Sequence, residues 1–412
     1  MSLLASAFRE QVANTKDIAM KSEMTYSVSY PTGFLNMDFA NGYIQEVNGY
    51  RRYELGISDG SMNMFISDSG VGKTTIATQI GCNIIKPFKT SCMFIEAAEV
   101  GFNFQRVKNL SGFDDDTFNK RLIIRDSGIT TESIYERVKK VYDIKTANPE
   151  AYMYDTGMRD INGKPVMKFE PTVFLIDSVK MVLSEKGTEA DSINNMSAAQ
   201  NANANSQNYS RMVPLCRTAN IIMIFINHIT TDINTGFLPK KAELAYLKQG
   251  EHLPGSKALI YMQNNIFRLD IKSKLKPDEG LYINGSVVSL DIVKSRTNTS
   301  SRAKCNLVFD QATGYNNELS LYMMLKDRKI LEGSAVRPQL PGSEIKFTQK
   351  TFLETLYTNQ EFYNEFVTVC VNVLKADLDA EYERIKEENK YNEAVKSPYQ
   401  SMLDKLNSLS AA

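Results

Sequence analysis

What the sequence lacks excludes several classes of protein. Its 48 lysines and arginines equal its 48 aspartates and glutamates, so the formal net charge is zero. A surface that bound nucleic acid along its whole length would be basic, so contact with nucleic acid has to come from local patches. The five cysteines are scattered and show neither metal-ligand spacing nor a disulfide framework. They indicate reduced thiols of a cytoplasmic protein.

Long apolar runs are also missing. The apolar opening at residues 1–5 is soon followed by Arg9 and Glu10, which makes it too short for a signal peptide. No later run is long enough to span a bilayer, so we expect no membrane partner. A chain of 412 residues exceeds a single core, and we expect a main domain with smaller appendages.

The most informative segment directly follows the apolar residues 62–66. It consists of Ser67, Asp68, Ser69, Gly70, Val71, Gly72, Lys73, Thr74 and Thr75. This order is typical of a strand that turns through a phosphate-binding loop into a helix, where backbone N–H groups and the helix N-terminus face phosphate oxygens. We expect Lys73 to neutralise the β and γ phosphates and Thr74 to hold Mg²⁺. The segment therefore predicts a nucleotide triphosphatase.

One departure and one alternative accompany this motif. The usual pattern opens with glycine, and Ser67 would be strained there if its φ were positive. The alternative to a phosphate loop is a chance cluster of glycine, lysine and threonine at a helix N-terminus. The preceding strand and the following helix favour the loop.

Around the loop, the chain alternates apolar strands with helices. Strands are predicted at residues 62–66, 91–96, 121–125, 172–176 and 220–226, and helices at 74–85, 102–110, 131–144 and 201–217. This alternation predicts an α/β fold with a mostly parallel, twisted sheet flanked by helices on both faces. A ligand should then lie at the carboxyl ends of the strands. Residues 148–171 interrupt the alternation with two turn signals and predict a β-hairpin.

The two ends of the chain follow other patterns. Residues 3–19 predict an amphipathic helix and residues 25–30 a lone strand. Helices are predicted near the C-terminus at residues 347–357, 361–374 and 377–390. We therefore expect an N-terminal helix and strand at 1–45, an ATPase core at 46–325 and a C-terminal helical region at 326–412.

Two of the predicted strands deliver acidic side chains to the expected ligand edge. The strand at 172–176 ends in Asp177, a position suited to an acid beside Mg²⁺ and its water. The strand at 91–96 ends in Glu96, and Glu99 follows three residues later. Either glutamate could be the general base opposite the γ phosphate. Alternatively, both are surface acids at a strand end.

A third strand ends in Asn227 and His228, and a long polar segment follows it at 229–254. His228 is one of only two histidines. We expect it to sense the γ phosphate, although a lone histidine is more often structural. The segment carries basic residues around an aromatic one, which suits contact with a nucleic-acid backbone. These residues are Lys240, Lys241, Tyr246 and Lys248.

Taken in order, these motifs resemble the RecA family of homologous recombinases, and in particular its bacteriophage UvsX-like branch. The phosphate loop, the strand-end glutamate, Asp177-Ser178, Ile226-Asn227-His228 and the run from Val293 to Thr297 carry the resemblance, which covers residues 25–325. It implies a RecA-like P-loop NTPase core and a DNA-dependent ATPase that uses ATP and Mg²⁺. Such proteins form helical filaments on single-stranded DNA and promote strand pairing and exchange with duplex DNA in recombination, repair and recombination-dependent replication.

The resemblance also implies roles at the nucleotide. Lys73 and Thr74 are expected as phosphate and Mg²⁺ ligands, and Asp177 supports Mg²⁺. Glu99 is preferred over Glu96 as the catalytic base because Glu99-Val100-Gly101 matches the family's Glu-Phe-Gly. His228 takes the switch position that couples the γ phosphate to the DNA loop.

Three further positions follow from the resemblance. Arg106 stands where the family usually stacks an aromatic ring on adenine, and a guanidinium can also stack. Lys294 and Arg296 look like the cationic pair that reaches the ATP of a neighbouring subunit. Single-strand-binding and mediator proteins are further expected partners, in the host cytoplasm if a bacteriophage encodes the chain.

Several alternatives stay open. Two DNA loops are implied, at 185–194 and 229–254, but the first is acidic and has Lys186 as its only cation. The strand at 25–30 resembles a segment that adds to a neighbouring subunit's sheet, or it pairs within its own chain. The same fold could instead serve a nucleotide-dependent assembly or regulatory protein without strand exchange, or a hexameric helicase.

Overall fold

The computed structural model describes residues 27–47, 50–99, 102–160, 162–185, 195–231, 244–275, 284–296 and 303–394. The helix expected at 3–19 lies outside the described residues. So do Lys186, Lys240 and Lys241, and most of the first expected DNA loop. Among the helices described, none is long and apolar enough to cross a membrane.

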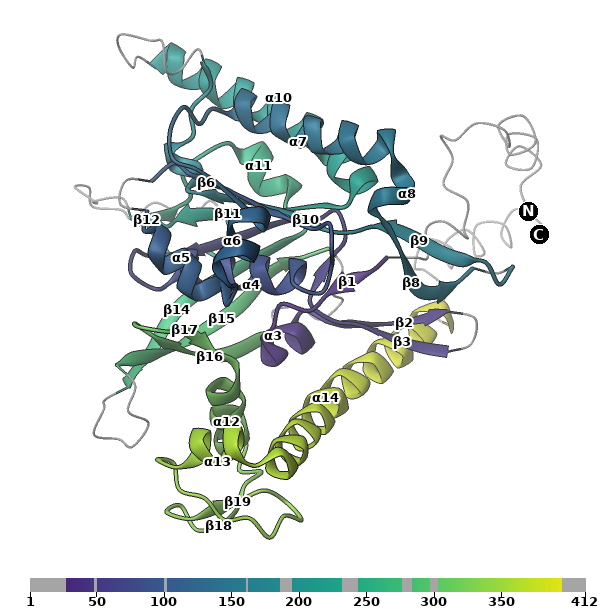
Figure 1. Cartoon of the computed structure of the whole chain (residues 1–412), viewed down its shortest axis with the longest axis vertical. Helices are drawn as coiled ribbons and strands as arrows, with labels where there is room; N and C mark the ends of the chain where they lie inside the picture. The colour runs from purple at the N-terminus through teal and green to yellow at the C-terminus, as the bar shows by residue number, and fades with distance from the viewer. Residues whose placement is uncertain are drawn as a thin grey trace, which may run out of the picture.

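A nine-stranded sheet forms the centre of the molecule (Figure 1). In sheet order, its strands are β17 (Gly314–Asn316), β16 (Lys304–Asp310), β15 (Gly285–Ser295), β14 (Asn265–Leu275), β5 (Met62–Ser67), β11 (Ile221–His228), β10 (Thr172–Asp177), β6 (Met93–Ala97) and β7 (Leu122–Arg125). From β14 to β7 all neighbours are parallel, while β15, β16 and β17 join by antiparallel pairing. The predicted α/β class with a mostly parallel sheet is confirmed. This arrangement is compatible with a RecA-like core without identifying one.

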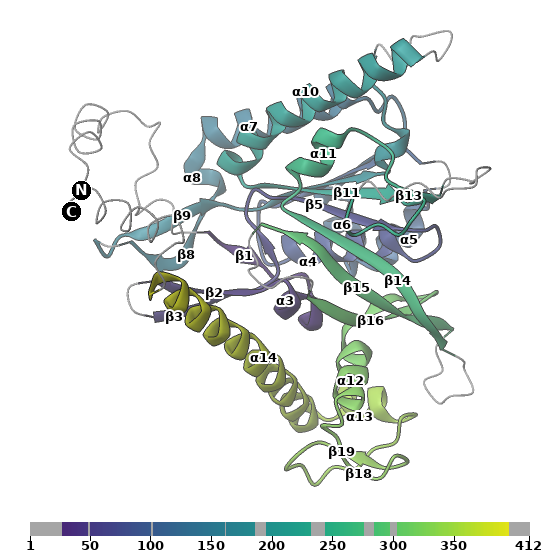
Figure 2. The same cartoon turned by 180° about the vertical axis from the view of Figure 1, so that it is seen from behind.

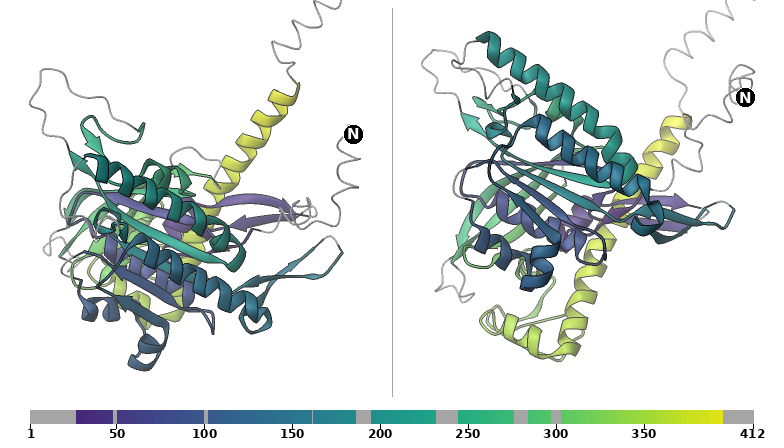
Figure 3. Two further views of the ribbon diagram at one scale, coloured as in Figure 1. Left: turned by 90° about the horizontal axis from the view of Figure 1, so that it is seen from above. Right: turned by 45° about the horizontal axis from the view of Figure 1, so that its top comes forward.

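Helices cover both faces of this sheet (Figures 1 and 3). One face carries α4 (Lys73–Ile85), α5 (Phe104–Ser111) and α6 (Asp115–Arg121), and the other carries α7 (Thr131–Ala147), α10 (Asn195–Ala219) and α11 (Lys257–Met262). Successive strand residues point to opposite faces. On β10, Val173 and Leu175 join the apolar cluster under α4, whereas Phe174 and Ile176 join the one under α7 and α10. Burial on both faces explains why this strand is apolar throughout.

The described part of the expected N-terminal strand pairs within its own chain. In β1 (Ser29–Tyr30), both residues pair antiparallel with β4 (Ile57–Ser58). The Tyr30 ring is buried, and its hydroxyl accepts a hydrogen bond from Asn220 (2.7 Å). For these two residues, the expected pairing with a neighbouring subunit is therefore corrected to pairing inside the chain.

Two hairpins project from the core. β8 (Met153–Arg159) and β9 (Pro165–Phe169) form the hairpin predicted for residues 148–171, and α8 (Pro149–Tyr152) precedes it. The hairpin of β2 (Tyr43–Val47) and β3 (Tyr50–Glu54), and the short helix α3 (Leu35–Ala40) before it, were not predicted.

The C-terminal region is helical, as predicted, but the helices differ in extent. It contains α12 (Asn317–Asp327), the small pair β18 (Glu332–Gly333) and β19 (Pro338–Gln339), α13 (Phe352–Thr358) and α14 (Gln360–Ala394). The single helix α14 replaces the two helices predicted at 361–374 and 377–390, and it runs back to the β2–β3 hairpin (Figure 2). Phe39 and Val308 of the core share an apolar cluster with Phe352 and Phe366, so the expected boundary at 325 does not separate two cores.

Candidate nucleotide-binding site

The predicted phosphate loop joins the carboxyl end of β5 to the first turn of α4. Ser67 is the last residue of β5 and is fully buried. The φ of Ser67 is not positive, so the backbone strain considered for this position is absent. Gly70 and Gly72 have φ of +80° and +94°, and a Cβ at Gly72 would lie 3.0 Å from the Phe309 ring. Glycine is therefore required at 72 for both conformation and space.

The loop wraps around the Lys73 ammonium. Its Nζ donates to the Ser67 carbonyl (3.0 Å), the Ser67 hydroxyl (3.0 Å) and the Asp68 carbonyl (2.8 Å). The serine that replaces the usual glycine thus gives the lysine an extra acceptor. Burial lowers the pKa of Lys73 to about 8, against the attraction of Asp177 and Glu99. No carboxylate pairs directly with this ammonium among the described residues, so an anion entering the loop would meet an uncompensated cation.

Thr74 and Asp177 meet at the mouth of the loop. The Thr74 hydroxyl donates to Asp177 Oδ2 (2.6 Å). The other oxygen, Oδ1, is buried and has no hydrogen-bond partner in the described structure. Burial raises the pKa of Asp177 to about 6, although the hydrogen bond from Thr74 lowers it. A buried acceptor without a partner is costly, and a cation would satisfy it.

Glu99 and His228 form a chain of polar contacts that begins at Lys73. The Glu99 N–H donates to the Asp177 carbonyl (3.1 Å), which holds the glutamate beside Asp177, the candidate Mg²⁺ ligand. His228 Nε2 lies 3.3 Å from Glu99 Oε2, and Nδ1 lies 3.4 Å from Lys73 Nζ. Burial and the nearby Lys73 lower the pKa of His228. A neutral imidazole that accepts from Lys73 at Nδ1 and donates to Glu99 from Nε2 satisfies both contacts.

Glu96 is placed elsewhere. It is fully buried on β6 and pairs with Arg137 of α7, so its side chain lies on the face of the sheet opposite α4. Burial raises the pKa of Glu96, and the charge of Arg137 opposes that rise. The structure therefore brings Glu99, and not Glu96, to the loop.

Arg106 borders a cavity beside the loop. Its guanidinium donates to the Gln311 carbonyl (2.8 Å) and to the Thr75 hydroxyl (3.4 Å). A cavity of about 190 Å³ lies between this arginine, Asn103 and Asp177. The cavity is continuous with the Thr74 end of the loop, which is where a nucleoside attached to bound phosphates would extend.

Lys294 and Arg296 are far from the loop of their own chain. Lys294 donates to the carbonyls of Ile260 (3.0 Å) and Tyr261 (2.8 Å), and Arg296 donates to Tyr261 (2.5 Å), at the end of α11. Ser295 pairs with the first residue of β14, which lies beside the start of β5. The pair is therefore at the sheet edge opposite the loop. It could reach a nucleotide only in a neighbouring copy arranged head to tail.

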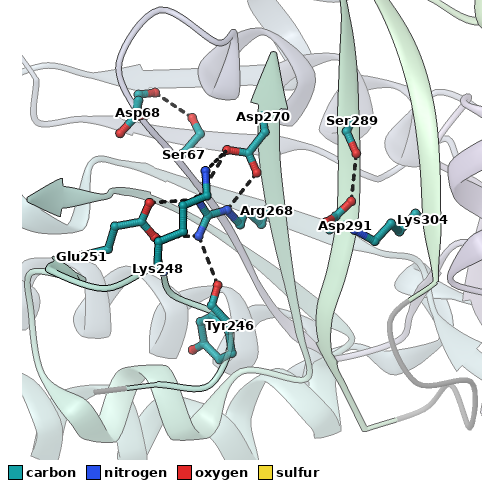
Figure 4. A network of polar contacts seen from close by, with 10 residues as sticks. All are labelled: Ser67, Asp68, Tyr246, Lys248, Glu251, Arg268, Asp270, Ser289, Asp291 and Lys304. Carbon is teal, nitrogen blue, oxygen red and sulfur yellow. Dashed lines mark hydrogen bonds and ion pairs between the residues drawn. The ribbon is translucent and has the colours of Figure 1, made fainter. Parts of the chain in front are cut away.

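The polar segment after His228 is anchored at its two ends. β12 (Thr230–Thr231) pairs with β13 (Glu251–His252), and the Asn227 amide donates to the Pro254 carbonyl (2.8 Å). Asn227 thus faces the segment and not the loop. Lys248 is mostly exposed and lies 3.8 Å from Asp270 (Figure 4). The Tyr246 ring packs against the apolar cluster of α10.

Arg268, which holds this segment to β14, lies outside every motif of the sequence. It donates to Glu251, Asp270 and the Tyr246 carbonyl. Its partners Tyr246 and Glu251 lie 22 and 17 residues away along the chain, so only the pattern of a charged residue inside an apolar strand could have marked it.

The residues present fit Mg²⁺ and a triphosphate. Among the described residues, no three His, Cys, Asp or Glu side chains gather as a metal cage. Mg²⁺ usually takes one or two carboxylates together with substrate phosphates, so a cage is not required. Thr74 and Asp177 would hold the cation, and Lys73 with the loop N–H groups would hold the phosphates. The metal would neutralise charge that develops on the transferred phosphoryl group.

No protein-family model matches the chain, and a search of curated proteins finds no match.

Proposed function

We propose that this protein binds ATP with Mg²⁺ at residues 67–75 and hydrolyses it to ADP and phosphate. The observation that carries the proposal is the convergence of Lys73, Thr74, Asp177, Glu99 and His228 at one end of β5. Lys73 supplies an incompletely paired cation, and Asp177 supplies a carboxylate oxygen without a partner. Glu99 is in position to orient or deprotonate a water opposite the γ phosphate.

We further propose that hydrolysis serves homologous recombination, as the resemblance to RecA-family proteins implies. The chain would form helical filaments on single-stranded DNA and promote strand pairing and exchange. The placement of Lys294 and Arg296 at the far edge of the sheet supports this, because a head-to-tail filament would bring them to the next subunit's ATP.

The test is ATP turnover with and without single-stranded DNA. The wild-type protein should hydrolyse ATP faster with DNA, and Lys73→Met should lose turnover by about 10²–10³-fold, as when one charge-stabilising group is removed. Lys145→Met is a matched control, because Lys145 is also buried with a pKa lowered by burial to about 8, yet it donates to the Glu170 and Ala219 carbonyls. Equal turnover by wild type and Lys73→Met would contradict the proposal.

A second candidate is a nucleotide-dependent assembly or regulatory protein that does not exchange strands. Lys248, one of the expected DNA contacts, is near the carboxylate of Asp270, which favours this candidate. DNA binding across a salt series separates the two, since phosphate contacts give a steep salt dependence. A hexameric helicase would show rings instead of filaments in electron micrographs.

A further inference from the structure

A buried arginine connects the nucleotide site to the polar segment that follows His228. Arg268 lies on β14 opposite Ile66 of β5, and Ile66 directly precedes the phosphate loop. Its side chain is only 6% exposed. Figure 4 shows the guanidinium between Glu251 and Asp270, with Lys248 beside them.

The guanidinium of Arg268 uses all of its donors. Nη1 donates to Glu251 Oε2 (2.7 Å) and to the Tyr246 carbonyl (3.1 Å). Nη2 donates to Glu251 Oε1 (3.0 Å) and Asp270 Oδ1 (3.4 Å), and Nε donates to Asp270 Oδ2 (2.8 Å). Only arginine offers this planar set of donors, so lysine cannot reproduce it. The Lys248 ammonium, 3.8 Å from Asp270, balances the second carboxylate.

This contact fixes one strand of a pair whose other strand starts at the nucleotide site. Glu251 is in β13, where it pairs with Thr231 of β12. Between His228 and β12 there is only Ile229, whose N–H donates to the Ser67 carbonyl (3.0 Å). The same carbonyl accepts from Lys73. β12 is therefore tied to the phosphate loop, while β13 is tied to β14 through Arg268.

We propose that Arg268 is a positioning residue that couples nucleotide occupancy to DNA binding. It holds β13 stationary on β14, so a shift of His228 toward a γ phosphate moves β12 against a fixed partner. Without the anchor, β12 and β13 move together and their relation does not change. This inference rests on the proposed function, because it concerns the same nucleotide site and its response to DNA.

The experiment compares basal with DNA-stimulated turnover in Arg268→Lys, Glu251→Gln and the double variant, using an oligo-dT strand. Basal kcat and the KM for ATP should stay within about twofold of wild type. Stimulation by DNA should fall at least about fivefold in each single variant, which is the lower range of coupling between sites. The double variant should be no worse than either single variant, because both break one contact.

Asp291→Asn is the matched control. Asp291 lies opposite Arg268 in the β14–β15 register and forms an ion pair with Lys304 (2.7 Å), but among the described residues it has no hydrogen bond or ion pair with β12 or β13. Figure 4 shows it apart from Glu251 and Lys248. The variant should leave the stimulation unchanged. A purely structural role of Arg268 would lower the melting temperature and reduce basal and stimulated turnover together.

The outcomes separate the two proposals. An active, DNA-stimulated wild type with normal stimulation in the variants overturns the role of Arg268 alone. A wild type without ATP turnover overturns the proposed function, and this inference with it. If Arg268→Lys does not fold, Glu251→Gln decides, because it keeps the size of the side chain and one hydrogen-bond acceptor.

Discussion

Charged residues behave in opposite ways at the nucleotide site and along the α14 seam, the contact between α14 and the β2–β3 hairpin. At the site, burial shifts the pKa of Lys73 down and that of Asp177 up, so each is pushed toward its neutral form. Along the seam, hydrogen bonds from Tyr382 and Lys386 lower the pKa of Glu46, and Glu46 in turn raises that of Lys386. The charges of the seam pair with each other. At the site, by contrast, no carboxylate of the described residues pairs directly with Lys73, and Asp177 Oδ1 has no hydrogen-bond partner there.

This difference supports the proposal that residues 67–75 bind a ligand. Charges that solvent and ion partners satisfy contribute little to stability. Charges that are buried and incompletely paired cost stability, and proteins retain them mainly where function needs them. The comparison therefore predicts that changes at the site and changes near the seam will separate activity from stability.

The largest effect is expected at Glu99, one of the two glutamates considered as the general base. Glu99→Gln should lower kcat by about 10²–10⁴-fold with ATP binding retained, because it removes a general base. Glu96→Gln should instead leave kcat near that of the wild type, because Glu96 pairs with Arg137 on the face of the sheet opposite α4 and does not reach the loop. Steady-state kinetics and urea unfolding of both variants check this. The assignment is wrong if Glu96→Gln loses turnover at full stability.

The apolar cluster beside α14 should carry the stability that its ion pairs do not. Phe366 is buried against Phe352 with ring centroids 5.2 Å apart. Phe366→Ala should lower the free energy of unfolding by about 3–5 kcal/mol, through lost burial and the cavity left behind. Turnover by the folded fraction should be unchanged. An unchanged free energy of unfolding together with impaired turnover would contradict the assignment of this cluster to stability.

Asp177→Asn should stabilise the nucleotide-free protein while abolishing Mg²⁺-dependent turnover. The pKa of Asp177 rises from 3.8 to about 6 on folding, so the penalty is absent below the unfolded value and complete above the folded one. The gain of the variant is therefore about 2–3 kcal/mol above pH 7 and disappears as the pH falls through 6 toward 4. Thermal unfolding from pH 4 to 8 measures it. A gain that grows at low pH would contradict the assignment.

The smallest effect is expected along the seam. Arg51 and Glu383 form an ion pair, and both side chains are more than 40% exposed. Arg51→Met should shift the melting temperature by no more than about 2 °C and leave turnover unchanged. Differential scanning calorimetry at low and high salt checks this. A large, salt-dependent shift would show that the seam, too, holds strongly coupled charges.

Local apolar patterns were sufficient to predict the central strands and the end of the sheet at which the candidate site residues meet. The runs at 62–66 and 172–176 lie in β5 and β10, and the run at 220–226 overlaps β11 from Ile221 onward. The carboxyl ends of these strands bring Lys73, Asp177 and His228 together. Parallel pairing makes this convergence predictable, because the ends of neighbouring strands meet at one edge.

Features set by distant contacts were not predictable in the same way. The alternation of strand residues alone does not show which of Glu96 and Glu99 faces the loop. Only the packing of α7 on the sheet shows that Glu96 forms an ion pair with Arg137. The within-chain pairing of Tyr30 and the anchoring by Arg268 depend on partners brought close by the fold. The break expected between two C-terminal helices fails because no glycine or proline stands at residues 375–376.

Calorimetric titration with a non-hydrolysable ATP analogue and Mg²⁺ tests the central claim most directly. The wild type should bind one analogue per chain in a Mg²⁺-dependent manner, Lys145→Met should bind it as well, and Lys73→Met should not. No binding by the wild type, or equal binding by Lys73→Met, would contradict the assignment of residues 67–75 as a nucleotide site.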